Sequence, residues 1–222
     1  MIITAVINAI AVVIGSTIGI LLKRGLPERI KKILFYAVGL STVGLGITMI
    51  LKVNNFLIVL GSMALGGIIG EIIDIENFLR KVGNSIKEGD FSTGFVASSL
   101  LFLVGPMTIV GSITAGLTGD GSIIYMKSLL DGISSVVLAS VYGLGVMLSS
   151  LSVLIIQGVI VFSSSKLSFL TQEVYLNDLI AVGGLMVLGI GLKILEIKDT
   201  KIGNFLPALF VSPFLVFIVS KF

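Results

Sequence analysis

Residues 94–118 read GFVASSLLFLVGPMTIVGSITAGLT, a run without a charged residue that is interrupted near its centre by Gly105-Pro106. A helix of about 20 apolar residues crosses the hydrocarbon core of a bilayer, so this run is long enough to span a membrane. Pro106 has no amide hydrogen to donate and its ring clashes with the preceding turn, which predicts a kink or a break. Broken backbone is tolerated in a membrane where protein or a water-filled cavity satisfies it. The run therefore predicts an all-α integral membrane protein with a broken helix.

The composition of the whole chain agrees with this prediction. The 222 residues are 55% hydrophobic and 12% charged, with a mean hydropathy of +1.16, whereas a soluble domain is about a quarter charged. The chain has no Cys and no His, which excludes a Ser-His-Asp triad, thiolate chemistry and iron–sulfur clusters. We therefore expect no enzyme, no cofactor and no resident metal, although a hard-cation site of carboxylates and carbonyls stays open.

Other apolar runs predict further membrane spans at residues 2–22, 33–51, 56–73, 177–195 and 202–220. The uncharged run 132–165 is too long for one span, so we expect a hairpin of two helices turning near residues 149–152. If the first of them begins earlier, it carries Lys127 and Asp131 into the membrane. The result is one transmembrane domain over 1–222 with eight helices, seven being the alternative: helices 1–3 in 1–73, helices 4–5 in 94–149 and helices 6–8 in 150–222.

The distribution of basic residues predicts the orientation of these helices. With eight spans, the loops on one side hold 11 of the 15 basic residues, namely Lys23, Arg24, Arg29, Lys31, Lys32, Arg80, Lys81, Lys87, Lys193, Lys198 and Lys201. Basic residues are retained on the cytoplasmic side, so both termini are predicted to lie outside the cytoplasm. Residues 74–93 carry apolar side chains at helical spacing, from Ile75 to Ile86, which predicts an amphipathic helix at the cytoplasmic interface. The net charge of +3 therefore indicates membrane orientation and no nucleic-acid partner.

Two glycine-rich segments resemble each other. Residues 37–51 read AVGLSTVGLGITMIL and residues 181–195 read AVGGLMVLGIGLKIL, and each is followed by Asn-Phe-Leu, at 55–57 and at 204–206. In the expected topology these helices run in opposite directions, which predicts an inverted repeat of helices 1–3 and 6–8 around helices 4–5, a common construction of transporters. A chance likeness of two Gly-rich helices is the alternative. Small-residue faces of this kind also favour close helix packing and a homo-oligomer.

The candidate solute-binding residues gather around the broken helix and the segment after it. They are Gly105, Pro106, Thr108, Ser112, Asp120, Lys127, Ser128 and Asp131, together with Asn8 in the first span and Asp178 at the start of the seventh. Lys127 and Asp131 are four residues apart, so they share a helix face and can pair. An ionisable pair beside a long apolar run is costly unless it faces a cavity or a partner, which makes it a functional-site hypothesis. Pairing at the lipid headgroups is the structural alternative.

The segments FLVGPMTIVGSI (102–113), GLTGD (116–120) and KSLLDGISS (127–135) resemble the YdfK-like (YqgA-like) family of bacterial membrane proteins, a domain of unknown function. The resemblance extends to INAIAVVIGSTIG (7–19) and to the GGIIGE stretch that begins at Gly66, and it covers nearly the whole chain. It implies a multi-pass protein of the bacterial cytoplasmic membrane. It provides no substrate.

These observations favour a transporter or channel-like permease for an ion or a small polar solute, embedded in the lipid bilayer. The alternative is a non-transporting scaffold or sensor partner that self-associates through its Gly-rich helix faces. An intramembrane serine–lysine enzyme is disfavoured, because the adjacent residues Lys127 and Ser128 do not face each other on a helix.

Overall fold

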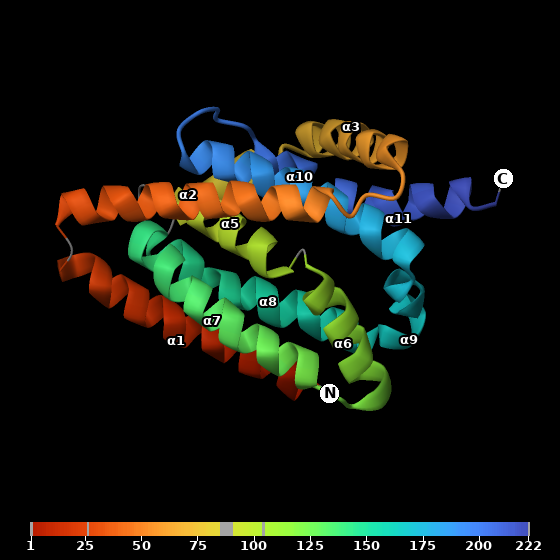
Figure 1. Cartoon of the computed structure of the whole chain (residues 1–222), viewed down its shortest axis with the longest axis horizontal. Coiled ribbons are helices and arrows are strands. Elements are labelled where there is room, and N and C mark those ends of the chain that lie inside the picture. The colour runs from red at the N-terminus through yellow and green to blue at the C-terminus, as the bar shows by residue number, and fades with distance from the viewer. Residues whose placement is uncertain (1, 26, 85–90, 104, 222) are drawn as a thin grey trace. The chain divides into compact units, whose positions relative to one another are not determined.

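A computed structural model describes residues 2–25, 27–84, 91–103 and 105–221, and within these ranges the chain forms helices and turns without a strand. Figure 1 shows the helices in chain order. Their bounds are α1 (Ile3–Gly25), α2 (Glu28–Ile50), α3 (Phe56–Ile73), α4 (Ile75–Asn84), α5 (Phe91–Leu103), α6 (Pro106–Thr118), α7 (Ser122–Tyr142), α8 (Leu144–Phe162), α9 (Ser164–Leu167), η1 (Ser168–Thr171), α10 (Glu173–Ile194), η2 (Ile202–Phe205) and α11 (Ala208–Val219).

The helices confirm the predicted all-α membrane architecture. Within the described residues, seven helices are long and apolar enough to cross a bilayer, and an eighth crossing results if α5 and α6 count as one bent span. The two are bent by 57° at the predicted break. Gly105 precedes α6 in extended conformation and Pro106 is its first residue, where the missing amide hydrogen costs no helical hydrogen bond. Proline thus ends one helix and starts the next.

The helices form two compact units. Unit 1 comprises residues 1–38 and 82–168, and unit 2 comprises residues 39–81 and 169–222. In unit 1, α1 lies beside α7 (Figure 1). A Cβ atom built on Gly15 would lie 2.1 Å from the Gly132 carbonyl oxygen, and one on Gly19 would lie 2.3 Å from that of Val136. Glycine therefore allows these two helices to approach at backbone distance, and they run parallel.

The turn between α7 and α8 differs from the sequence prediction. It lies at Gly143, whereas residues 149–152, where the hairpin was expected, belong to the interior of α8. Gly143 has φ 69° and ψ −134°, a conformation that is strained for residues with a side chain. Because the turn comes earlier, the first helix of the hairpin also begins earlier, at Ser122, and includes Lys127 and Asp131. Of the two possibilities for this segment, the structure therefore has the one in which the first helix begins earlier and carries Lys127 and Asp131.

In unit 2, α2 and α10 cross antiparallel through reciprocal glycine contacts. On each helix, two glycines lie against the other helix, so that a Cβ atom built on any of the four would collide with it. The contacts are Gly39 with Leu195 and Gly46 with Leu188 from α2, and Gly184 with Met49 and Ile50 and Gly191 with Val43 from α10. α3 and α11 also pack antiparallel: a Cβ on Gly66 would meet the Ala208 amide nitrogen at 2.3 Å, and one on Gly70 the Asn204 carbonyl at 1.8 Å. The two Gly-rich helices that resemble each other in sequence, α2 and α10, therefore contact each other in the same way from both sides.

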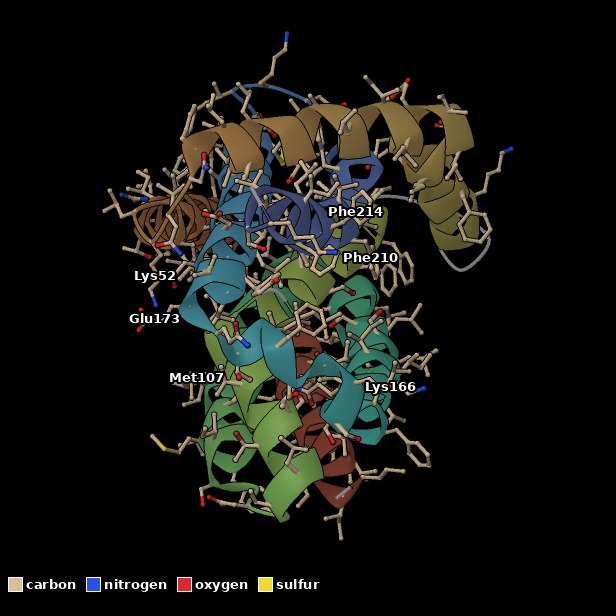
Figure 2. All side chains as sticks on the ribbon, turned by 90° about the vertical axis from the view of Figure 1, so that its right-hand side faces the viewer. Lys52, Met107, Lys166, Glu173, Phe210 and Phe214 are labelled. Atoms are coloured by element: carbon tan, nitrogen blue, oxygen red, sulfur yellow. The ribbon has the colours of Figure 1, made fainter. Side chains whose placement is uncertain are left out.

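Exposed apolar side chains cover the outer faces of both units. Phe210 and Phe214 on α11, labelled in Figure 2, are 80% and 62% exposed. On α4, the predicted amphipathic helix, Glu76 is buried while Phe78 is 64% exposed; Ile86 and Lys87 of that prediction lie outside the described residues. In water such a surface would be an aggregation liability, but hydrocarbon is its natural solvent.

Candidate functional site

The core of unit 1 contains a buried ion pair. On α7, Nζ of Lys127 donates to Oδ2 of Asp131 at 2.5 Å, and the two side chains are 7% and 9% exposed. Asn8 of α1 donates from Nδ2 to the same carboxylate oxygen at 3.0 Å. The parallel packing of α1 and α7 sets this contact, because Gly15 and Gly19, about two and three turns further along α1, bring the two backbones together. Three of the predicted site residues therefore meet.

Gln157 of α8 completes this network and was not among the predicted site residues. Its Oε1 accepts a second hydrogen bond from Nδ2 of Asn8 at 3.3 Å, and the side chain is fully buried. A sequence signal for it existed, since Gln157 is the one carboxamide in the uncharged run 132–165. We call Asn8, Lys127, Asp131 and Gln157 the polar cluster. It is formed by α1, α7 and α8, three helices that pack against one another.

The broken helix lies next to the polar cluster. Nζ of Lys127 is 5.9 Å from the centre of the Phe102 ring, a distance at which an ammonium is attracted to the aromatic face. Phe102 is in the last turn of α5, where the break leaves carbonyls without their helical partners. The Thr108 hydroxyl, at the start of α6, donates to the Phe102 carbonyl at 2.8 Å and is completely buried. Thr108 thus replaces a hydrogen bond that the break at Pro106 removes.

Thr108→Val is expected to destabilise the protein by about 1 to 3 kcal/mol, because it leaves the buried Phe102 carbonyl without a donor at nearly constant volume. Thr108→Ser keeps the hydroxyl and is the matched control. The measurement is the midpoint of thermal unfolding of the purified variants in detergent. Equal midpoints for Val and Ser would contradict this role of the hydroxyl.

Several buried polar atoms in unit 1 have no hydrogen-bond partner among the described residues. They are Oδ1 of Asn8, Nε2 of Gln157, and the hydroxyls of Ser16 and Ser112. Two of them belong to the polar cluster, and Ser112 is a predicted site residue on α6. An unsatisfied polar group in a membrane interior costs several kcal/mol. Buried atoms of this kind fit a site that a polar solute or ion completes.

The remaining predicted site residues lie elsewhere. Ser128, on α7, donates its hydroxyl back to the Ile124 carbonyl of its own helix. Asp120 lies exposed in the turn between α6 and α7, where its carboxylate accepts hydrogen bonds from the side chain and the backbone amide of Ser122. These hydrogen bonds lower the pKa of Asp120. Its position is that of a turn-stabilising residue.

Asp178 belongs to unit 2, whereas the residues of the polar cluster belong to unit 1. It lies in the second turn of α10, and its Oδ1 accepts hydrogen bonds from the backbone amides of Asn54 and Asn55, at 2.8 and 2.9 Å. Glu76 similarly binds the segment around the second Asn-Phe-Leu, because its Oε2 accepts a hydrogen bond from the Gly203 amide at 2.9 Å. Its Oε1 pairs with Lys193 at 3.2 Å. The two Asn-Phe-Leu connectors are therefore each held by a buried carboxylate. We expect a structural role for both.

Comparisons with a family profile and with individual proteins both find similar sequences over nearly the whole chain. The profile of the family described as "Protein of unknown function (DUF554)" matches residues 3–217. The "Uncharacterized membrane protein YdfK" of Bacillus subtilis (strain 168) is 33% identical over 221 residues, which cover 98% of this chain and 96% of that protein. The "Uncharacterized protein YqgA" of Escherichia coli (strain K12) is 34% identical over 223 residues, covering 96% and 95%. No solved structure matches the chain.

Proposed function

Because the chain belongs to the DUF554 family of membrane proteins, whose name carries no activity, we propose a function from its own geometry: it is a permease for an ion or a small polar solute rather than an enzyme. The observation that carries the proposal is the polar cluster. A Lys–Asp pair, an Asn and a Gln are buried between spans that are otherwise apolar. Ionisable residues inside a membrane mark substrate or ion pathways by default.

The inverted repeat that the sequence predicts is part of the same proposal. The register that pairs Asn55 with Asn204 also pairs Asn8 with Gln157, and these two carboxamides contact each other. In that register four of the buried positions of α1 correspond to buried positions of α8–α9: Thr4, Asn8, Val12 and Gly15 correspond to Val153, Gln157, Val161 and Ser164. A residue that contacts its own counterpart is what a two-fold axis between α1 and α8 produces. Transporters built this way bind their solutes where the repeats meet.

The direction of the helices agrees with eight alternating crossings. α1 and α7 run parallel, and α8 returns antiparallel after Gly143, as the first, fifth and sixth crossings of such a bundle must. An even number of crossings leaves both termini on one side, and we propose a protein of the bacterial cytoplasmic membrane with both termini outside the cytoplasm. The basic residues near the ends of α1 and α10 would then lie in the cytoplasm, as the positive-inside rule expects.

Water access to the polar cluster tests the proposed function. The chain contains no Cys, so single variants Ser112→Cys and Gln157→Cys report on one position each. A membrane-impermeant thiol reagent applied to proteoliposomes is expected to label both, more slowly than Asp120→Cys in the exposed turn. Val159→Cys, on the exposed face of α8, is the matched control and is expected to remain unlabelled, because lipid excludes the reagent.

Flux provides the second measurement. Proteoliposomes containing the wild type are expected to take up radiolabelled sodium, rubidium or a small polar solute from a screened panel, and Asp131→Asn is expected to abolish that uptake. Complete protection of both thiols, together with no flux across the panel, would contradict a permease. It would favour the scaffold alternative, in which the polar side chains hold helices together.

A further inference from the structure

The charge balance around the polar cluster depends on a single pair of side chains. The sequences of α5, α6 and α8 contain no ionisable residue, and α1 has only Lys23 and Arg24 in its last turn. On α7 itself, the other titratable groups are two tyrosines, of which Tyr125 is 46% exposed. The Lys127 ammonium is therefore the one positive charge that neutralises Asp131 within these helices.

The two residues lie at different depths. Asp131 follows the first residue of α7 by nine positions, or about 14 Å at 1.5 Å per residue, which is near the middle of a hydrocarbon core about 30 Å thick. Lys127 is one turn closer to the helix start, and its side chain is long enough to place the ammonium nearer the surface. In the structure the Lys127 head group is paired with Asp131, and the side chain is long enough to extend instead in the direction of the connection that holds the exposed Asp120.

The polar cluster contains one carboxylate and two carboxamide groups, whose oxygens are candidate ligands. Oδ2 of Asp131 accepts from both Lys127 and Asn8, and Oε1 of Gln157 accepts from the same Asn8 nitrogen. Oδ1 of Asn8 is fully buried and has no donor among the described residues. One carboxylate and two carboxamide oxygens are hard ligands of the kind that bind alkali cations. Groups of three or more Asp, Glu, His or Cys are absent from the described residues, so a divalent ion has no comparable ligand set here.

We propose that Asp131 is the ligand of a small alkali cation, sodium or potassium, and that Lys127 is a built-in competitor for the same carboxylate. This inference rests on the proposed function and assigns the coupling ion of that site. In the closed state the Lys127 ammonium occupies the cation's place. When the cation binds, Lys127 turns toward the outer end of α7, and the carboxylate remains neutralised throughout.

Removing the competitor is the sharpest test. In Lys127→Met the carboxylate keeps its oxygens and loses its internal counter-charge, so an added cation is expected to stabilise this variant more than the wild type. The purified protein is heated in detergent at constant pH and ionic strength, with choline chloride replaced stepwise by sodium or potassium chloride. We expect a saturable rise in Tm of about 5 to 10 °C for Lys127→Met, as binding at about 100 times Kd produces, and a smaller rise for the wild type.

Two controls separate this effect from general salt effects. The double variant Lys127→Met/Asp131→Asn lacks both charges and is expected to show no cation-specific rise. Lys201→Met removes the lysine of the exposed Lys201–Glu71 pair and is expected to respond like the wild type. A rise in Tm on acidification alone, without a response to sodium or potassium, would overturn the proposal.

If Lys127→Met does not fold, Lys127→Gln replaces it, and equilibrium binding supplies an independent measurement. Radiolabelled sodium or rubidium, the latter a potassium analogue, is expected to bind the wild type and not the charge-balanced double variant. Equal binding to the two would overturn the inference. Cation binding without any flux would count against the proposed permease alone, and flux without Asp131-dependent cation binding would count against the coupling ion alone.

Discussion

Asp131→Asn is expected to lower the free energy of unfolding by about 3 to 5 kcal/mol, because it leaves the Lys127 ammonium buried without its counter-charge. The ammonium is 7% exposed, and the helices around it hold no other carboxylate. Adding Lys127→Met to this variant is expected to restore most of the loss, since apolar groups often replace a buried ion pair at little cost. Denaturant unfolding in mixed micelles measures all three proteins on one scale.

The exposed pair of unit 2 is the matched control for this prediction. Glu71→Gln breaks the contact with Lys201, whose side chain is about half exposed, and solvent screens such pairs strongly. We expect unfolding of Glu71→Gln to be close to that of the wild type. If the single Asp131→Asn variant were as stable as the double variant, the Lys127 ammonium would not depend on Asp131 for its neutralisation, which would contradict this prediction.

A double substitution in α1, Gly15→Ala with Gly19→Ala, is expected to cost about 2 to 6 kcal/mol, from two overpacked sites of about 1 to 3 kcal/mol each. Each new methyl would lie within 2.3 Å of a backbone carbonyl of α7, so the two helices must move apart. Because the same approach positions Asn8 against Asp131, the variant is also expected to lose flux. Unfolding in mixed micelles and the uptake assay check the two effects.

Glycines without close neighbours provide the comparison. A Cβ atom on Gly44 or Gly158 would meet nothing within 4 Å, so Ala at either position is expected to be neutral or to stabilise its helix by up to about 1 kcal/mol. A comparable loss in Gly158→Ala and in the α1 variant would mean that the destabilisation comes from the backbone and not from helix packing.

Much of the fold is predictable because membrane spans are encoded locally. The length of each apolar run predicts a crossing, and Pro106 predicts the break between α5 and α6, since both depend on the backbone of one segment. The sequence predicts the turn of the α7–α8 hairpin too far along the chain, at residues 149–152 in place of Gly143. The three serines in residues 149–152 resemble a turn in composition, but Gly143 takes the positive φ that the turn requires. Hydroxyls are tolerated inside the helix, where Ser149 donates to the Val146 carbonyl.

The site was predictable only in part. The spacing of Lys127 and Asp131 encodes their pairing on one helix, whereas the contacts of Asn8 and Gln157 join segments more than 120 residues apart. Apart from Gln157 and three serines, α8 is apolar on all sides, so its sequence does not indicate which neighbouring helix Gln157 faces. Asp178 illustrates the same limit: its position at the start of a helix was visible, but its bond to the α2–α3 connector depends on how α2 and α10 cross.

The single-residue turn at Gly143 has a consequence for biogenesis. Of the seven candidate spans among the described residues, α7 has the lowest hydropathy and α8 one of the highest. Lys127 and Asp131 each make insertion of α7 from the translocon unfavourable by a few kcal/mol. With one residue between them, the two helices enter the bilayer as a hairpin, and the apolar α8 can carry its charged neighbour across. Lengthening this turn with a flexible linker would separate the two insertion events and leave α7 outside the membrane in part of the newly made chains.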